Sequence, residues 1–165
     1  MRLLGRIAVL VLVLGLIAMW VFALWFPHDV PGRLADPAFP NAAQPICQAT
    51  MDRINALPKS IETPEASARA DVVDRGTVEI ERMVTELRSV LPAAQPERDI
   101  ASRWIDDYAT YASDRRDYTR QLRTDPTTRF AVTQSDRDNK QITYAIDHFA
   151  QVNPMPACVT PGDVA

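Results

Sequence analysis

The feature that most constrains this chain is a run of 20 uncharged residues, rich in leucine, valine and isoleucine, that begins at Ile7 and ends at Phe26. At about 1.5 Å per residue, a helix of this length crosses a hydrocarbon layer of about 30 Å. Arg2 and Arg6 precede the run, and positive charge favours the cytoplasmic side. We therefore predict a cytoplasmic N-terminus (1–6), a transmembrane helix (7–26) in the plasma membrane and an extracytoplasmic C-terminus.

A cleaved signal peptide is the alternative interpretation, because it also combines a basic start with an apolar stretch. Signal peptides usually have about 7–15 apolar residues before a small-x-small site, and the stretch here is longer. The nearest acceptable site, after Ala23, lies inside the apolar run. The pattern favours a retained membrane anchor, with a cleaved signal peptide as the alternative.

A proline-rich segment follows the apolar run, with prolines at 27, 31, 37, 40 and 45. Proline fixes φ and lacks an N–H donor, so closely spaced prolines discourage both helix and sheet. We predict an extended stalk over 27–41 and a folded extracytoplasmic domain over 42–165.

Within that domain, apolar residues recur with the period of an α-helix. The pattern predicts helices over 45–57, 63–91 and 96–122, and a shorter one from Tyr144 to Asn153. The second and third helices are joined by a short turn, which predicts a long antiparallel helical hairpin. Arg129 to Thr133 instead alternates with period two, and with Gln141 to Thr143 it predicts a minor β-hairpin. The expected fold class is mainly α, a transmembrane helix plus a small helical bundle.

The chain has two cysteines, Cys47 on the apolar stripe of the first predicted domain helix and Cys158 near the C-terminus. Outside the cytoplasm, two cysteines far apart in sequence usually form one disulfide. Reactive or metal-binding thiols are the alternative, but no CxxC spacing or histidine cluster accompanies them. We predict a structural Cys47–Cys158 bond.

Charged residues place limits on the partners. With 18 basic and 21 acidic residues, the net charge of −3 does not favour nucleic acid, which needs clustered Lys and Arg. Arg115 stands apart because its helical position places it on an apolar stripe with Tyr108, Tyr111 and Tyr118. It could bind an acidic ligand group together with Tyr108 and Tyr111, and the alternative is an intramolecular salt bridge.

Other polar clusters carry ordinary explanations. Asp106 and Asp107 are helical neighbours that point about 100° apart, so a solvated face is favoured over a carboxylate pair. The run 135–140 lacks the glycine and the oxygen ligand of a calcium loop and is interpreted as a turn. His148 has only His28 as a possible zinc-binding companion. No catalytic residue, metal or cofactor is predicted.

The run from Ile146 to Ala150, followed by Asn153, Met155, Cys158, Pro161 and Asp163, resembles the ending of uncharacterised exported proteins of high-GC Gram-positive bacteria. Those proteins also carry one N-terminal membrane span. The resemblance brings no activity with it.

These observations together favour a membrane-anchored, non-enzymatic extracytoplasmic domain that binds an envelope protein or envelope ligand. One alternative is an exported ligand-sensing or hydrolytic domain with a pocket near Arg115. Another is that the span itself assembles with a larger membrane complex and the domain serves as a spacer.

Overall fold

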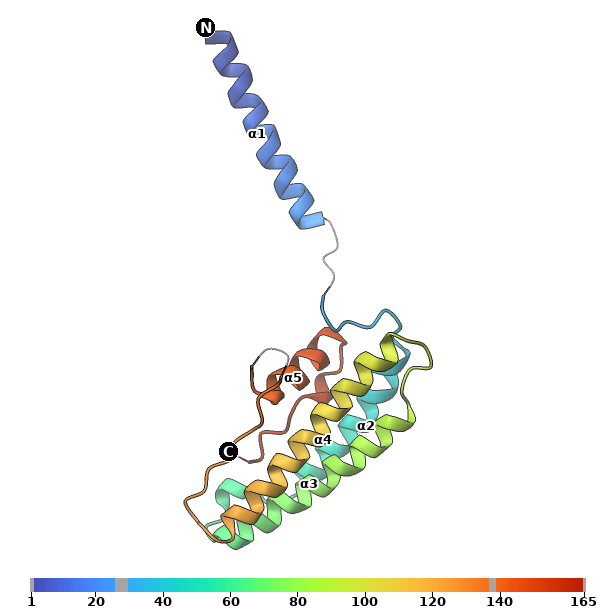
Figure 1. Cartoon of the computed structure of the whole chain (residues 1–165), viewed down its shortest axis with the longest axis vertical. Helices are drawn as coiled ribbons and strands as arrows, with labels where there is room; N and C mark the ends of the chain where they lie inside the picture. The colour runs from blue at the N-terminus through green and yellow to red at the C-terminus, as the bar shows by residue number, and fades with distance from the viewer. Residues whose placement is uncertain (1, 26–29, 137–138, 165) are drawn as a thin grey trace. The chain divides into compact units, whose positions relative to one another are not determined.

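The computed structural model describes residues 2–25, 30–136 and 139–164 and is mainly helical (Figure 1). The helices are α1 (Arg2–Trp25), α2 (Ala38–Asn55), α3 (Ala66–Ser89), α4 (Glu97–Leu122) and α5 (Ile142–Val152), with 3₁₀ turns η1 (Ser60–Glu62) and η2 (Pro156–Cys158). The chain divides into one unit that ends at Pro31 and a second, compact unit that begins at Gly32.

The first unit contains α1. Within the part of the chain that the structure describes, no helix combines the length and the hydropathy required of a membrane span. The transmembrane helix expected over 7–26 is therefore not supported by this finding, and Phe26 lies outside the described residues.

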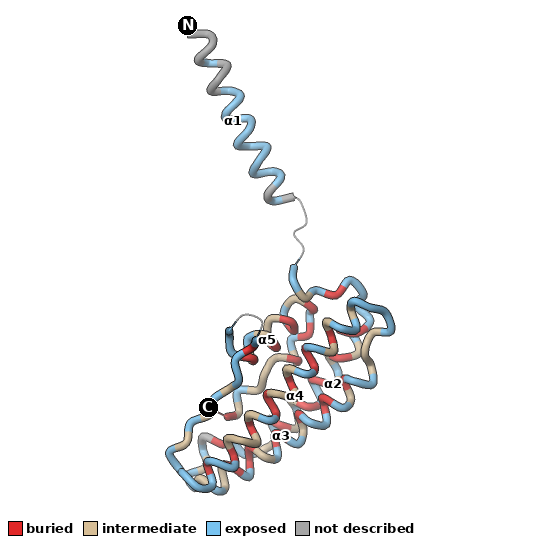
Figure 2. Tube along the Cα trace, viewed as in Figure 1, coloured by how far each residue is buried: buried red, intermediate tan, exposed pale blue. Residues whose placement is uncertain are grey.

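The second unit is a helical bundle built around the predicted hairpin of α3 and α4, which make the most extensive helix–helix contact. Buried positions recur as a stripe along both helices (Figure 2). The buried side chains include Val73, Ile80, Met83 and Leu87 on α3, and Ala101, Trp104, Tyr108 and Leu122 on α4. The three-and-four spacing of these residues thus predicted the core face of each helix.

Trp104 is the aromatic centre of the core. Its ring stacks on Phe149 of α5, with centroids 4.9 Å apart, and meets the edges of Phe39 and Tyr108 at 6.0 and 5.4 Å. The indole N–H donates to the carbonyl of Ile146 at 3.2 Å. Trp104 therefore joins α2, α4 and α5 and satisfies its one polar atom in doing so.

The start of the domain differs from the predicted stalk. α2 begins at Ala38, and Leu34 before it is buried, with its backbone N–H bonded to the side chain of Asn153 at 2.8 Å. Pro40 is tolerated because the first N–H groups of a helix have no partner within the helix. Pro45 lies inside α2, where burial of Phe39, Ala43 and Cys47 offsets the lost hydrogen bond.

The predicted β-hairpin is wrong. The described residues contain a single isolated bridge, between Gln134 and Gln141. The chain enters α5 at Ile142, so the residues after Gln141 are helical and cannot extend the bridge into a ladder. The side chain of Phe130 instead packs against Tyr111 and Tyr118 of α4, at centroid distances of 6.0 and 5.4 Å. The apolar side chain of Phe130 is thus covered by helix α4 and not by a second strand.

Candidate functional site

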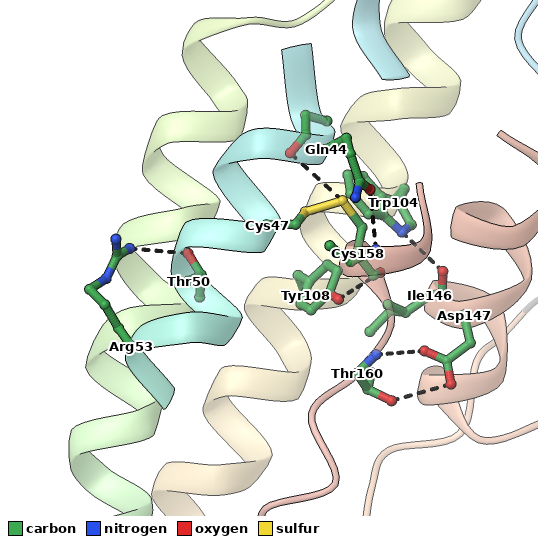
Figure 3. Close-up of a disulfide and its surroundings, with 12 residues drawn as sticks. Gln44, Cys47, Thr50, Arg53, Trp104, Tyr108, Ile146, Asp147, Cys158 and Thr160 are labelled. Atoms are coloured by element: carbon green, nitrogen blue, oxygen red, sulfur yellow. Dashed lines mark hydrogen bonds between the residues drawn. A yellow bond between two sulfur atoms is a disulfide. The ribbon is translucent and has the colours of Figure 1, made fainter. Parts of the chain in front are cut away.

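Cys47 and Cys158 form the predicted disulfide (Figure 3). Their Cα atoms lie 5.1 Å apart, and both residues are buried. The bond joins α2 to η2 and closes a segment of 111 residues. Tyr108 lies beside it and donates its hydroxyl hydrogen to the carbonyl of Cys158 at 2.9 Å.

Arg115 is completely buried and forms an intramolecular ion pair. Its two terminal nitrogens donate to the carboxylate oxygens of Asp163 at 2.6 and 2.7 Å. The remaining N–H groups donate to the hydroxyl of Thr77, the hydroxyl of Tyr111 and the carbonyl of Val73. All five guanidinium donors are therefore used within the chain. Of the two interpretations of Arg115, the intramolecular salt bridge is the one that the structure shows.

Gly76 makes room for this ion pair. A Cβ atom at this position would lie 2.8 Å from a terminal nitrogen of Arg115 and 3.0 Å from an oxygen of Asp163. Any larger residue at this position would require the end of the Arg115 or Asp163 side chain to shift. Sequence reasoning did not single out Gly76 or Asp163 as functional, although a glycine on a core stripe is a recognisable sign of close approach.

The two tyrosines expected beside Arg115 are also held by the core. Burial is the main reason that the pKa of Tyr108 lies well above its ordinary value. Burial raises the pKa of Tyr111 as well, although the neighbouring Arg115 opposes the shift. Tyr111 donates its hydroxyl hydrogen to the carbonyl of Pro161 at 3.3 Å. Both rings therefore stay neutral and act as donors.

Asp74 organises a second charged network between α3 and α4, which is more exposed than that of Arg115. Burial raises the pKa of its carboxyl, but hydrogen bonds from Arg123, Thr119 and Arg116 outweigh this and lower the pKa overall. Arg116 also pairs with Glu81 at 2.8 Å. The network links the two helices electrostatically, and its residues line none of the described clefts.

The largest described cleft lies beside Phe130 and has a volume of about 620 Å³. Its walls come from α4, from the segment that follows α4, from the start of α5 and from the C-terminal segment. Aromatic, cationic and hydroxyl groups all line it, from Tyr118, Phe130, Arg129, Thr128 and Thr143. A volume of this order is typical of ligand sites.

A second, smaller cleft of about 290 Å³ adjoins the first. Both are lined by Tyr118, Arg129, Ala131 and Val132. The two clefts therefore share the segment 129–132 as a wall, and we call this segment the rim segment.

Asp147 is the acidic residue of the larger cleft, and it is already engaged. One carboxylate oxygen accepts from the backbone N–H of Thr160 at 2.7 Å and the other from its hydroxyl at 3.2 Å (Figure 3). Its task is to hold the C-terminal segment against α5. Arg129 is exposed, and within the described ranges no hydrogen bond or ion pair of its side chain is found.

The remaining sequence candidates lie apart from the clefts. Asp106 pairs with Arg88 at 2.8 Å on the surface, and the ring of His148 stacks on Tyr144. Part of the 135–140 run, at 137–138, lies outside the described residues. Across the described residues, no three His, Cys, Asp or Glu side chains gather as metal ligands would.

Comparisons of the chain with protein-family models, with curated proteins and with solved structures found no match.

Proposed function

We propose that this protein is a membrane-anchored extracytoplasmic binding domain that takes a segment of a partner protein into the paired clefts. The observation that carries the proposal is the pair of clefts, of about 620 and 290 Å³, that share the rim segment as a wall. Two clefts that share four lining residues suit an extended polypeptide better than one compact small molecule. The network around Arg115 lies in the core beneath it and acts as its support.

The extracytoplasmic location is supported by the disulfide, because such bonds persist in oxidising compartments. The anchor is supported by the uncharged run and by the described side chains of α1. The large apolar ones are each at least 46% exposed, and Leu10, Leu14 and Leu24 are more than half exposed. An apolar surface of this extent requires a cover. A bilayer would provide that cover for a run of this length.

The binding role is tested by photo-crosslinking the tagged, full-length protein in cells. A photoreactive residue replaces Gln141, which lines the larger cleft, or, as a control, Val78 on α3, which lines none of the described clefts. We expect one partner protein to be captured reproducibly from position 141 and not from position 78. Equal capture from both positions, or none from 141, would overturn the proposed role.

The anchor is tested separately by alkaline extraction of membranes. We expect the unchanged chain to stay in the pellet and the Leu14→Arg/Ile17→Arg variant to move to the supernatant, because an arginine at mid-span costs about 3 kcal/mol. The side of the membrane on which the C-terminus lies is tested with a C-terminal tag. Protease added to cells with a permeabilised cell wall and an intact plasma membrane should digest this tag. If the unchanged chain is extracted, the anchor is wrong and the binding role must be retested without it.

A further inference from the structure

The rim segment has the pattern of a strand that lacks a partner. After α4 ends at Leu122, the chain turns and runs back along this helix (Figure 1). Two contacts fasten it there. The ring of Phe130 packs on Tyr111 and Tyr118, and Thr133 donates its backbone N–H and its hydroxyl to Asp114 at 2.7 and 2.8 Å. Along the rim segment the exposure alternates, with Arg129 and Ala131 exposed and Phe130 and Val132 half-buried.

The backbone of the rim segment makes no hydrogen bond to the residues that the structure describes. The neighbouring bonds are those from Thr128 N–H to Asp125, from Ser135 N–H to Lys140 and from Ile142 N–H to Thr133. The bridge between Gln134 and Gln141 starts a ladder that would pair Val132 with Thr143, but Thr143 is already in the first turn of α5. The N–H and C=O groups of 129–132 can therefore form hydrogen bonds with a strand of another molecule.

The surroundings of this segment suit the side chains of an added strand. The larger cleft, with Phe130 and Tyr118 in its wall, can accept an apolar side chain, and the smaller cleft lies across the shared residues. Three aspartates also line the clefts, but each is already engaged: Asp114 by Thr133, Asp117 by Arg120 and Asp147 by Thr160. The exposed guanidinium of Arg129 has no such partner among the described residues, so it offers a positive charge for an acidic side chain. Successive side chains of a strand point to opposite sides, which matches two clefts that share one segment as a wall.

We infer that the partner protein binds by adding an extended, acidic segment as a β-strand along residues 129–132. Backbone hydrogen bonds to the rim segment supply the pairing, and an Asp or Glu of the partner pairs with Arg129. The inference rests on the proposed function and specifies its mode. It also explains why residues with a strand pattern lie in this chain without a strand partner.

The probe is a random nonapeptide library displayed on phage and selected on the purified full-length protein in nanodiscs. The best binders are then synthesised, and their affinities are measured by fluorescence anisotropy. We expect the selected peptides to share an acidic position. Mono-N-methylation of the peptide should weaken binding at alternate residues only, because a strand pairs with its neighbour through every second residue.

Two pairs of variants locate the contact. Ala131→Pro removes one backbone donor and should weaken binding about fivefold, whereas Ala131→Ser keeps the donor and should stay within about twofold. Arg129→Glu should weaken binding about tenfold, and Arg103→Glu, which makes the same charge change on the exposed face of α4, should not. Circular dichroism confirms that each variant is folded.

Strand addition is overturned if no peptide is selected, or if the selected peptides bind Ala131→Pro and Arg129→Glu as tightly as the unchanged chain. In that case, the crosslinking experiment with a photoreactive residue at position 141 tests separately whether the domain binds a partner protein. If Ala131→Pro fails to fold, the N-methylated peptides still test the backbone pairing. Slowed amide exchange at 129–132 on peptide binding would support it directly.

Discussion

Arg115 and Asp163 form a two-armed ion pair between the middle of α4 and the C-terminal segment, with N–O distances of 2.6 and 2.7 Å. The guanidinium is fully buried, whereas the Asp163 side chain keeps 21% of its exposure. The pair fastens the residues that form one wall of the larger cleft, including Pro161, Gly162 and Val164. Stability of the domain and shape of the cleft therefore depend on the same contact.

Removal of the Asp163 carboxylate should destabilise the domain strongly. Asp163→Ala leaves a buried positive charge without its partner, and we expect the free energy of unfolding to fall by about 3 kcal/mol, as measured by urea denaturation. Asp117→Ala, at an exposed ion pair with Arg120, should cost less than about 1 kcal/mol. Equal effects of the two variants would show that the buried pair has no special weight.

Gly76→Ala should destabilise the domain although alanine is the better helix former. The added methyl would press on both Arg115 and Asp163, and the loss should exceed the roughly 1 kcal/mol that alanine gains in a helix. We expect a net loss of about 1–2 kcal/mol. Gly162→Ala is the matched control, because its Cβ would meet no atom within 4 Å. A stabilised Gly76→Ala variant would contradict the close approach seen here.

The disulfide should supply a large part of the stability. Closing a segment of 111 residues is worth about 4–5 kcal/mol in the chain-entropy model, so Cys47→Ala/Cys158→Ala should lower the free energy of unfolding by that order. Both sulfurs are buried, so a mild reductant should act only as the domain unfolds. Unfolding curves that are identical with and without reductant would refute this prediction.

Acid should weaken the α3–α4 interface through Asp74. The pKa of Asp74 in the folded chain lies below its ordinary value of 3.8, so its contribution is complete above that pH and is lost as the pH falls through the lowered pKa. Asp74→Asn should therefore cost about 2 kcal/mol at pH 7 and progressively less below pH 3.8. Asp71→Asn, at a side chain that is 69% exposed, should show a smaller effect. If the stability lost in Asp74→Asn were the same at every pH, the link between the lowered pKa of Asp74 and stability would be contradicted.

The helical part of the fold was predictable because it is a matter of local pattern. The three-and-four spacing along 63–91 and 96–122 predicted α3, α4 and their core faces to within a few residues. The period-two pattern of Arg129 to Thr133 was equally local, but it gave no information about a partner strand. Whether such a segment pairs depends on what lies beside it, and here that is helix α4.

The sequence alone determined the helical class, the two hairpin helices and the pairing of Cys47 with Cys158, because periodicity and a single cysteine pair leave few alternatives. Only the tertiary structure decided how Arg115 is used. A charge on an apolar stripe is compatible with a ligand site or with an internal ion pair, and the choice depended on Asp163, which lies 48 residues away along the chain. The clefts are likewise formed by segments that are distant in sequence and meet only on folding.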